Sequence, residues 1–529
     1  MQSCKMYDFY IFYKFTRRWT YSIVLFSMVC ILSLLAPETS KASELKSPRN
    51  LKIASQDKPP PGKKQPALFI LHVGNKAAQI AKSILKAGSQ GKIVAIPNQE
   101  RYELGQKVRM VAVPNPGYAF QGWEGSLSGK ANPQMITLQR NTHIKAKFEP
   151  RKEENTLHVA ETAEPPGDGS VSRPFSSIQA ALYTAQPGQT ILVQDGTYKE
   201  ALFIRRGGNA QEGPITILAQ NKGQVKITKK ERLLTVNHAH IIISGLEFDA
   251  QFSTTNGAIR VKQGAENLLL QEITLKNNAR HGINISYAPQ VSILDSLIHS
   301  CLWFEDADQE DTQLKRIDAH GLVATGVKGL MVAGTEIRDV SGDAFQLEYG
   351  SWDEALLDEV KFWNRPVPEE TAKALGFPDL AGLNPGEDAV DTKATADEVR
   401  GRLRIQNSEF HGWKSDFIAN AAALNLKHKV SAQVQGCTFD HNYIALRLRG
   451  PGSRPGAHVQ VEENTFRDNE THIRAEDRIE ELKIFNNIFY AQDSTVLQQA
   501  PSRRGIGPGF EAENNQVIGA ENPFAALLQ

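Results

Sequence analysis

Cysteine is scarce in this chain of 529 residues: it has four, and only Cys301 and Cys437 follow the first 45 residues. There is no CxxC pair and no histidine–cysteine spacing typical of zinc sites. A disulfide framework and a structural zinc cluster are therefore excluded. We expect Cys301 and Cys437 to be buried and to behave as small apolar side chains.

An excess of charge of one sign is also lacking. Sixty basic residues stand against fifty-nine acidic ones, which gives a formal charge of +1. This balance indicates no preference for nucleic acid or for a membrane surface. The sequence contains no Walker loop, HExxH or GxSxG, so these motifs do not support a nucleotide-binding, zincin or serine-hydrolase function.

Long apolar runs are missing except near the N-terminus, where Tyr21–Ala36 follows a basic stretch and precedes small residues near Ser43. This order predicts a secretory signal over residues 1–43 and export to the periplasm, the surface or the surroundings of a bacterium. The run is short for a membrane span. We therefore expect membrane association only if the segment stays uncleaved.

Residues 44–66 are rich in proline and lysine and have no apolar period, which predicts a linker. Short alternating strands such as VRMVAV and HIKAKF follow, separated by Pro, Gly and Asn, and predict a small β domain over residues 67–150. Its stretch PGYAFQGWEG…NPQMITLQRNTHIKAKF resembles bacterial repeat modules related to the internalin B-repeats. That resemblance implies a spacer or adhesive module.

A repeat dominates residues 155–529. Nine segments, from IIISGLEF at 241 to LKIFNNIF at 482, have apolar first, third and eighth residues, with a unit of 23 to 29 residues interrupted by insertions. Alternation at i and i+2 within such a unit predicts a parallel β-helix, whose equivalent residues stack ~4.8 Å apart. We expect one continuous buried stack of five rings, namely Phe362, Phe410, Phe439, Phe466 and Phe489.

The start of this region, GDGSVSRPFSSIQAALYTAQPGQTILVQDGTYKEALFI, resembles the opening coil of pectate-lyase-like right-handed β-helices. The resemblance implies an all-β protein, a right-handed parallel β-helix behind a small N-terminal β-module. It also implies a short helix at about 175–185 that covers the open end of the core, where strand edges would otherwise be unpaired. We expect a monomer.

Each coil has a second strand, and its outward residues form two columns if the strands stack in register. We expect both columns to face solvent. The first column is Asn284, Val323, Gln346, Asp391, Asn425, Arg447 and Arg474. The second column is Ser286, Thr325, Glu348, Lys393, Lys427, Arg449 and Glu476.

Acidic residues gather at one place along these columns, in NPGEDAVDTKATAD at 384–397. Calcium takes six to eight oxygen ligands in loose geometry, so we expect a Ca²⁺ site. Its predicted ligands are Asp343, Glu348, Glu387, Asp388 and Asp391. An ordinary charged face with cross-strand ion pairs and passive glycan binding remain alternatives. The acidic stretch at 305–318 has no strand pattern and predicts a solvated loop.

The stretch GEDAVDTKA, followed by LNLKHK, resembles the calcium-dependent β-helix lyases of polysaccharide lyase family 6, the alginate lyase and chondroitinase B group. This resemblance implies calcium ligands at Glu387 and Asp388 and a base at Lys393, with Lys427–His428 replacing the family's Arg-His pair.

The family 9 pectate lyases resemble the same stretch. The acidic pair and Asp391 fit that family's calcium ligands, although Asn425 stands where it has a lysine.

These patterns favour an exported, calcium-assisted lyase that acts on an acidic polysaccharide by removing the weakly acidic C5 proton of a uronate. Lys393 and Lys427 are the candidate bases, with a pKa that we expect neighbouring cations to lower. The predicted substrate-binding residues are Asn425, His428, Arg447, Arg449, Arg474 and Trp413. The alternatives are a non-catalytic glycan-binding or adhesive β-helix and a uronate C5-epimerase.

Overall fold

The computed structural model describes residues 67–72, 80–99, 101–139, 142–306, 314–348, 350, 352–393, 400–451, 455–500 and 506–524. The predicted signal at 1–43 and linker at 44–66 lie outside these ranges. No helix within them is long and apolar enough to cross a membrane.

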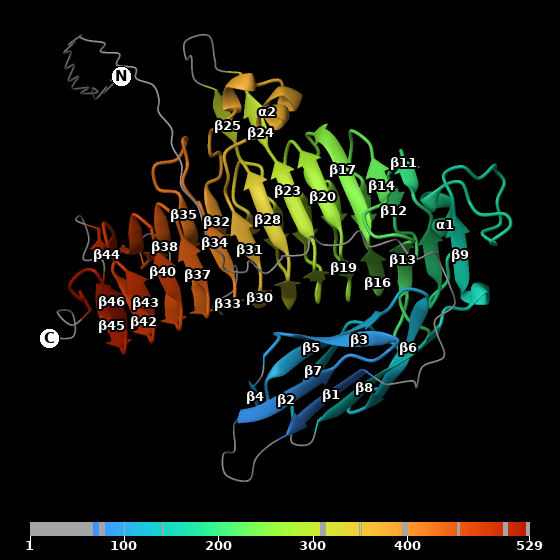
Figure 1. The fold of residues 1–529 in the computed structure, drawn as a ribbon, viewed down its shortest axis with the longest axis horizontal. Helices are drawn as coiled ribbons and strands as arrows, with labels where there is room; N and C mark the ends of the chain where they lie inside the picture. Colours follow the sequence, from blue (N-terminus) through green and yellow to red (C-terminus); the bar gives the residue numbers. More distant parts are fainter. Residues whose placement is uncertain are drawn as a thin grey trace, which may run out of the picture. The chain divides into compact units, whose positions relative to one another are not determined.

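Three long parallel sheets, of 13, 12 and 11 strands, run the length of the region that begins at Thr156 (Figure 1). Each coil adds one strand to each sheet, so the predicted parallel β-helix is confirmed. The third sheet contains β9 (Thr156–Val159), β10 (Thr190–Val193), β13 (Ile215–Ala219), β16 (Ile241–Ser244), β19 (Leu269–Gln271), β22 (Ser292–Leu294), β27 (Leu330–Ala333), β30 (Glu354–Asp358), β33 (Gly401–Gln406), β36 (Val430–Gln435), β39 (His458–Glu462), β42 (Ile479–Phe485) and β45 (Ile506–Glu513).

The other two sheets are named here by what they carry. The phenylalanine sheet contains β11 (Gly196–Tyr198), β14 (Val225–Thr228), β17 (Leu246–Ser253), β20 (Thr274–Asn278), β23 (Leu297–Cys301), β28 (Glu336–Val340), β31 (Lys361–Trp363), β34 (Glu409–His411), β37 (Thr438–Asp440), β40 (Thr465–Arg467), β43 (Ile488–Tyr490) and β46 (Gln516–Ile518). The site sheet contains β12 (Leu202–Phe203), β15 (Leu234–Val236), β18 (Ile259–Val261), β21 (Ile283–Ser286), β26 (Leu322–Thr325), β29 (Phe345–Leu347), β32 (Asp388–Thr392), β35 (Ala422–Leu426), β38 (Ile444–Arg449), β41 (Thr471–Glu476) and β44 (Thr495–Gln499).

The N-terminal end of the coil core is covered by α1 (Ile178–Thr184), within the range expected for a helix. Ser177 precedes it, and its hydroxyl accepts a hydrogen bond from the Ala180 backbone N–H, which satisfies one of the unpaired donors at a helix start. Ile178, Ala181 and Leu182 are buried in the coil core.

The small N-terminal β-module consists of antiparallel strands. Five form one sheet: β1 (Ala67–His72), β2 (Ile80–Lys86), β4 (Arg101–Glu103), β6 (Tyr118–Gly125) and β8 (His143–Pro150). A second sheet contains β3 (Gly91–Ile96), β5 (Lys107–Pro114) and β7 (Gln134–Thr137). A short 3₁₀ turn, η1 (Glu153–Asn155), follows the module. Arg109 of β5 is buried and donates to the backbone carbonyls of Val291 (3.0 Å) and Gly329 (2.7 Å).

The register of the site sheet agrees with the first predicted column at every step. The paired residues run Asn284, Val323, Gln346, Asp391, Asn425, Arg447 and Arg474. The prediction that these residues face solvent is wrong for the first five members of the column, because Asn284, Val323, Gln346, Asp391 and Asn425 are buried. They point away from the coil core, but other parts of the chain cover them.

Insertions leave the phenylalanine sheet and return to the site sheet at the edge where its strands begin (Figure 1). They contain the hairpin β24 (Trp303–Glu305) and β25 (Lys315–Ile317), together with α2 (Glu369–Leu375) and η2 (Pro378–Leu380). Their apolar side chains form a cluster of their own, in which Phe304 packs 5.7 Å from Phe417 between ring centroids. The stretch predicted as a solvated loop therefore contains a paired strand, although residues 307–313 lie outside the described ranges.

Cys301 and Cys437 are free thiols buried in the coil core, as predicted. Burial raises the pKa of each thiol to about 12. Both therefore stay protonated and unreactive at neutral pH.

The five phenylalanines form one continuous stack inside the coils, which confirms that prediction. Successive ring centroids lie 5.0, 4.8, 4.9 and 4.7 Å apart, and the rings are within 11° of parallel. Each ring is buried, and the spacing equals that of neighbouring strands. The stack consists of Phe362, Phe410, Phe439, Phe466 and Phe489.

Replacing Phe439 with alanine is expected to lower the free energy of unfolding by about 3 to 5 kcal/mol, because it leaves a cavity between two stacked rings. Chemical denaturation of the wild type and of Phe439→Ala measures this difference. Phe203→Ala is the matched control, because Phe203 is 45% exposed and its loss should change stability by about 0.5 kcal/mol or less. Equal losses in the two variants would contradict the role of the stack.

Candidate functional site

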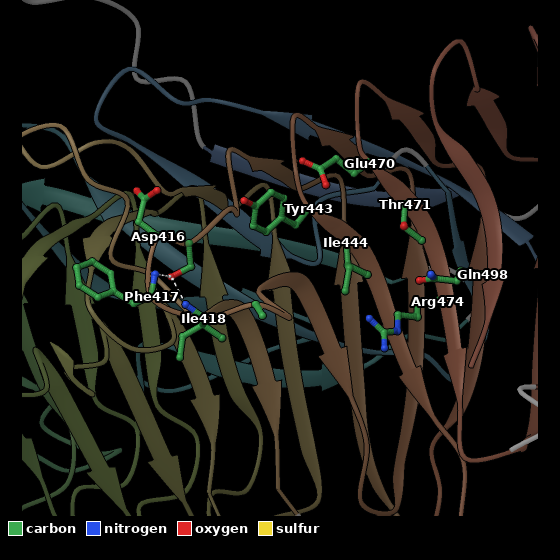
Figure 2. Close-up of a pocket in the computed structure, with 11 residues that line it drawn as sticks. Asp416, Phe417, Ile418, Tyr443, Ile444, Glu470, Thr471, Arg474 and Gln498 are labelled. Atoms are coloured by element: carbon green, nitrogen blue, oxygen red, sulfur yellow. Dashed lines mark hydrogen bonds between the residues drawn. The ribbon is translucent and has the colours of Figure 1, made fainter. Parts of the chain in front are cut away.

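A pocket of about 500 Å³ opens over the C-terminal part of the site sheet (Figure 2). The segment 415–419 forms one wall, and residues at the starts of β38 and β41 form the other. Tyr443 supplies an aromatic surface, Arg474 a guanidinium and Glu470 a carboxylate. An aromatic face beside such polar groups is a combination that can hold a sugar ring.

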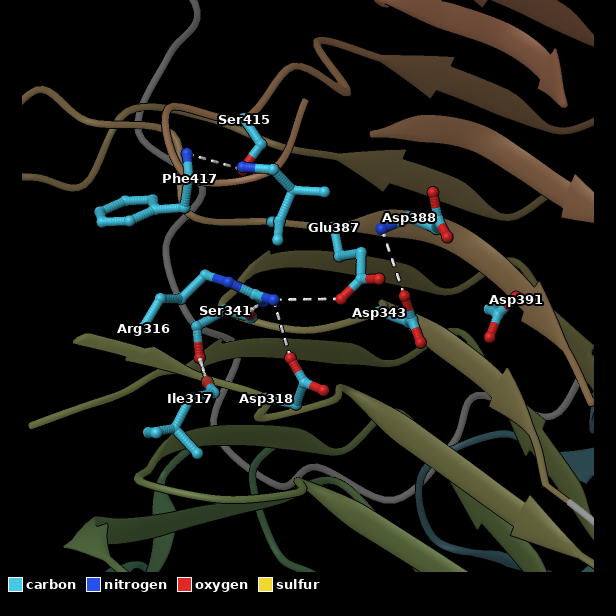
Figure 3. Close-up of polar contacts among 12 residues, drawn as sticks. Arg316, Ile317, Asp318, Ser341, Asp343, Glu387, Asp388, Asp391, Ser415 and Phe417 are labelled. Carbon is cyan, nitrogen blue, oxygen red and sulfur yellow. Dashed lines mark hydrogen bonds and ion pairs between the residues drawn. The ribbon is translucent and has the colours of Figure 1, made fainter. Parts of the chain in front are cut away.

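Carboxylates converge a few coils away, where β29 and β32 begin (Figure 3). One oxygen from each of Asp343, Glu387 and Asp388 lies within 4.8 Å of the other two. Asp343 comes from one coil and the other two come from the next. We call these three residues the acidic cluster; the sequence predicted all of them as cation ligands.

The other two predicted ligands lie outside the acidic cluster. Asp391 places its two oxygens against two lysines, 2.6 Å from Lys393 Nζ and 2.8 Å from Lys427 Nζ. Glu348 accepts a short hydrogen bond from the Gln346 side chain. Asp391 therefore joins the two candidate bases, and the prediction of Glu348 as a ligand is not supported by its position.

Hydrogen bonds between coils hold the acidic cluster in place. Asp388 accepts from the Ala422 backbone N–H at 2.9 Å and from Asn425 Nδ2 at 2.8 Å. Asp343 accepts from the Asp388 backbone N–H at 3.2 Å. The carboxylates are thus positioned by strands on either side of β32, and their orientation follows from the register.

Asn425, next to the acidic cluster, is incompletely paired. Its Nδ2 donates to Asp388, which fixes the orientation of the amide, and its buried Oδ1 has no hydrogen-bond partner among the described residues. A buried oxygen without a donor is costly unless something else pairs with it. The three carboxylates of the acidic cluster offer oxygen ligands only, which is the kind of ligand that calcium prefers.

Burial and mutual repulsion raise the pKa of Asp343 and of Asp388. Burial, followed by the charges of Asp391 and Glu387, raises the pKa of Asp388 to about 8. The pKa of Asp343 is raised well above its ordinary value by burial and by Asp391 and Asp388. A bound cation would remove the cause of the repulsion, so proton and cation compete for the same oxygens.

Two basic groups that the sequence did not indicate border the cluster. Arg316, from β25, lies 3.1 Å from a Glu387 oxygen and 2.9 Å from Asp318 (Figure 3). His320 accepts the Asp343 backbone N–H at its Nδ1 (2.7 Å), and burial lowers the pKa of its imidazole to about 3. The histidine is therefore neutral and does not balance the charge of Asp343.

The pKa of Lys393 is not lowered, contrary to what the sequence led us to expect. Burial alone would lower the pKa of its ammonium, but the adjacent Asp391 carboxylate outweighs burial, and the net pKa is raised. Lys393 therefore holds its proton firmly when no cation occupies the cluster. Its side chain is 25% exposed and that of Lys427 is 12% exposed, so both reach the surface beside the cluster.

The predicted arginine column is partly neutralised within the protein. Arg447, Arg449 and Arg474 all approach the buried Glu476, at 3.0, 3.5 and 2.8 Å. Arg474 also donates to Asn420 Oδ1 at 3.0 Å, beside the pocket. Three guanidinium groups around one carboxylate leave positive charge on this part of the site sheet.

Two other predicted substrate-binding residues end up in different places. The prediction that Trp413 binds substrate is wrong, because this residue is fully buried in the coil core. Its indole Nε1 donates to the Phe362 carbonyl at 3.1 Å. It cannot stack on a sugar. His428 lies just after β35, in a left-handed backbone conformation (φ 54°), and is half-buried beside Lys427.

Family models match two parts of the chain. Residues 157–347 match the model described as "Pel9A-like, right handed beta helix region", and residues 83–152 match "Divergent InlB B-repeat domain". The resemblances expected for these two regions are confirmed, including the right-handed coil. The β-helix match contains Asp343 and ends before Glu387.

No curated protein matches the chain. A solved rhamnogalacturonan lyase is similar at 12% identity and a TM-score of 0.43, over 71% of this chain and 92% of that one. The pectate lyase Pel9A has 13% identity and a TM-score of 0.38, over 70% and 81%. An alginate lyase from Paenibacillus sp. str. FPU-7 has 14% identity and 0.35, over 64% and 96%. The family-model match makes residues 157–347 similar to right-handed β-helix proteins of the Pel9A-like kind.

Proposed function

We propose that this protein is an exported, calcium-assisted lyase that cleaves a uronate-containing polysaccharide by β-elimination. The observation that supports this most is the acidic cluster beside two lysines that share Asp391. The Pel9A-like match over residues 157–347 is consistent with a carbohydrate substrate. The arginines and the pocket along the same sheet fit an acidic chain of sugars.

Asp343, Glu387, Asp388 and the Asn425 Oδ1 would hold the calcium ion. When bound there, calcium supplies positive charge that attracts the uronate carboxylate, stabilises negative charge developing beside it and weakens the hold of a neighbouring ammonium on its proton. Each of these residues contributes oxygen, and water or substrate oxygen would complete six to eight ligands.

The lysines have the proton-transfer role. Lys393 Nζ, once neutral, takes the C5 proton of the uronate, and the electron pair left on C5 forms the C4–C5 double bond. The C4–O bond breaks, and the leaving sugar oxygen takes a proton from water, to which the Lys393 ammonium then returns its own. Asp391 positions Lys393 and Lys427 through contacts of 2.6 and 2.8 Å. Arg447 and Arg474 would bind further uronate carboxylates along the groove.

The direct test is incubation with alginate, pectate and glycosaminoglycans, with calcium or with a chelator, while recording the ultraviolet absorbance of the unsaturated product. We expect absorbance to rise with one acidic polymer and to require calcium. Binding without absorbance would indicate a glycan-binding β-helix instead. A change in the NMR signals of the sugar without chain shortening would indicate a C5-epimerase.

Calcium affinity is expected to rise with pH up to about 8, because the ion must displace the proton that burial keeps on Asp388. Calorimetry at pH 6 and pH 8, in buffers of different ionisation enthalpy, measures both affinity and proton release. Asp388→Asn should abolish binding and keep the fold. Glu409→Gln, on the phenylalanine sheet, removes a half-exposed carboxylate paired with Lys361 and should change nothing. Unchanged affinity in Asp388→Asn would rule out this site.

The calcium-free protein is expected to lose stability as pH rises from about 4 to about 8. The folded-state pKa of Asp388 is raised to about 8, above the unfolded value of about 4, so the folded state binds more protons in that window. Melting temperatures across this range, with and without calcium, measure the effect. Asp388→Asn should flatten the calcium-free profile, and an unchanged profile in this variant would contradict the assignment.

Lys393→Arg is expected to lower turnover by orders of magnitude while substrate binding is nearly retained, because arginine keeps the charge but does not release its proton. Steady-state kinetics should show a large loss in kcat and a small change in KM. Lys427→Arg is the matched comparison. If only Lys427→Arg is inactive, Lys427 is the base; if both variants keep full turnover, the lysine mechanism is wrong.

A further inference from the structure

A second group of metal-binding side chains lies on the outward face of the phenylalanine sheet. Trp363, His411, Asp440 and Arg467 are paired in register on successive strands. His441 follows Asp440 at the turn. The Asp440 carboxylate lies between the two imidazoles, 3.2 Å from His411 Nδ1 and 2.8 Å from His441 Nδ1.

The distances match those between ligands of a single small ion. One ligand atom from each of His411, Asp440 and His441 lies within 4.8 Å of the other two. Metal–ligand bonds of about 2.0 to 2.1 Å in a tetrahedron place neighbouring ligands roughly 3.3 Å apart. Each imidazole directs its Nδ1 at a different oxygen of the same carboxylate, so the three groups already converge.

We propose that His411, Asp440 and His441 bind a divalent transition-metal ion of the zinc class. Two imidazole nitrogens and one carboxylate oxygen are a donor set that zinc, cobalt and nickel accept and that calcium disfavours. The site is therefore chemically distinct from the all-oxygen acidic cluster on the site sheet. His411 and His441 are 42% and 54% exposed, so a fourth ligand position is open to water.

Arg467 is the internal competitor for this site. Its Nε lies 3.4 Å from Asp440 Oδ1, and its side chain is 52% exposed. A surface ion pair of this kind contributes little stability, and the arginine has room to turn away when a cation binds. Removing its charge should therefore strengthen metal binding, which an explanation by histidine–aspartate hydrogen bonds alone does not predict.

The buried pair His281 and His320 is a weaker candidate for a metal site. The rings of His281 and His320 stack at 4.9 Å, and the Nδ1 of each accepts a backbone N–H, from His320 and Asp343 respectively. Those lone pairs are occupied. Burial lowers the pKa of both imidazoles to about 3. Both rings are therefore neutral and serve as hydrogen-bond acceptors.

The test is titration of the full chain with Co²⁺, followed by visible absorption, and then competition with Zn²⁺. We expect one equivalent of Co²⁺ to give the absorption of a site of four or five ligands, to be displaced by Zn²⁺ and to be unaffected by millimolar Ca²⁺. His411→Ala and Asp440→Asn should each weaken binding at least tenfold. Arg467→Gln should bind more tightly.

His458→Ala is the matched control, because His458 is a partly exposed histidine on the third sheet that pairs with Glu481. It should leave the Co²⁺ spectrum unchanged. Circular dichroism of each variant verifies the fold. Absence of a Co²⁺ spectrum in the wild type overturns the proposal, as does an unchanged spectrum in both His411→Ala and Asp440→Asn. Because calcium and lyase activity play no part in this readout, failure of the proposed lyase function would not affect it.

Discussion

In-register pairing of parallel strands is the constraint on which the rest of this structure depends. Each strand of the site sheet bonds to the equivalent strand one coil away, so residues distant in sequence become neighbours about 4.8 Å apart. Asp391 meets Asn425 in this way, just as Phe410 meets Phe439 inside the coil. A shift of one residue would exchange the inward and outward sets, so the core and the acidic cluster require the same register.

The cluster also shows how a folded chain can keep charge in a place that water barely reaches. Asp343 and Asp388 of the acidic cluster are 3% and 2% exposed, and Asp391 beside it is 2% exposed. Backbone N–H groups donate to Asp343 and Asp388, Asn425 donates to Asp388, and the two lysines pair with Asp391. The compensation is incomplete, since Asp388 and Asp343 favour the protonated state and the Asn425 oxygen has no donor. An arrangement that would be more stable with a neutral residue is typical of a site kept for function.

The sequence predicted most of what depends on local alternation. The β-helix, the ring stack, the capping helix and the register of the first column all follow from a period of two and a recurring unit, and all are confirmed. Alternation shows which way a side chain leaves its own coil. It does not show what covers that side chain afterwards, and for this reason Asp391 and Asn425 were expected in solvent.

The wrong and missing predictions have a related cause, namely that alternation gives no information on contacts between separate parts of the chain. Arg316 was missed because the insertion that carries it has no period to place it, whereas His320 repeats the position of His281 before the next strand of the site sheet and could have been found. Trp413 was expected to meet a sugar because it stands at a strand end, but it turns into the core. Burial lowers the pKa of Lys393, but the contact with Asp391 outweighs burial and raises the net pKa, and spacing alone cannot rank that contact against calcium.

The position of the insertions has a consequence for how such a protein can change. The hairpin of β24 and β25, the segment with α2, and the segment 412–421 all leave the coil at the same corner, between the phenylalanine sheet and the site sheet. Lengthening a connection at that corner leaves the strands of every coil intact and alters only what stands above the acidic cluster. Loop length at one corner can thus change the surroundings of the acidic cluster, while the repeat that supplies the stability stays the same.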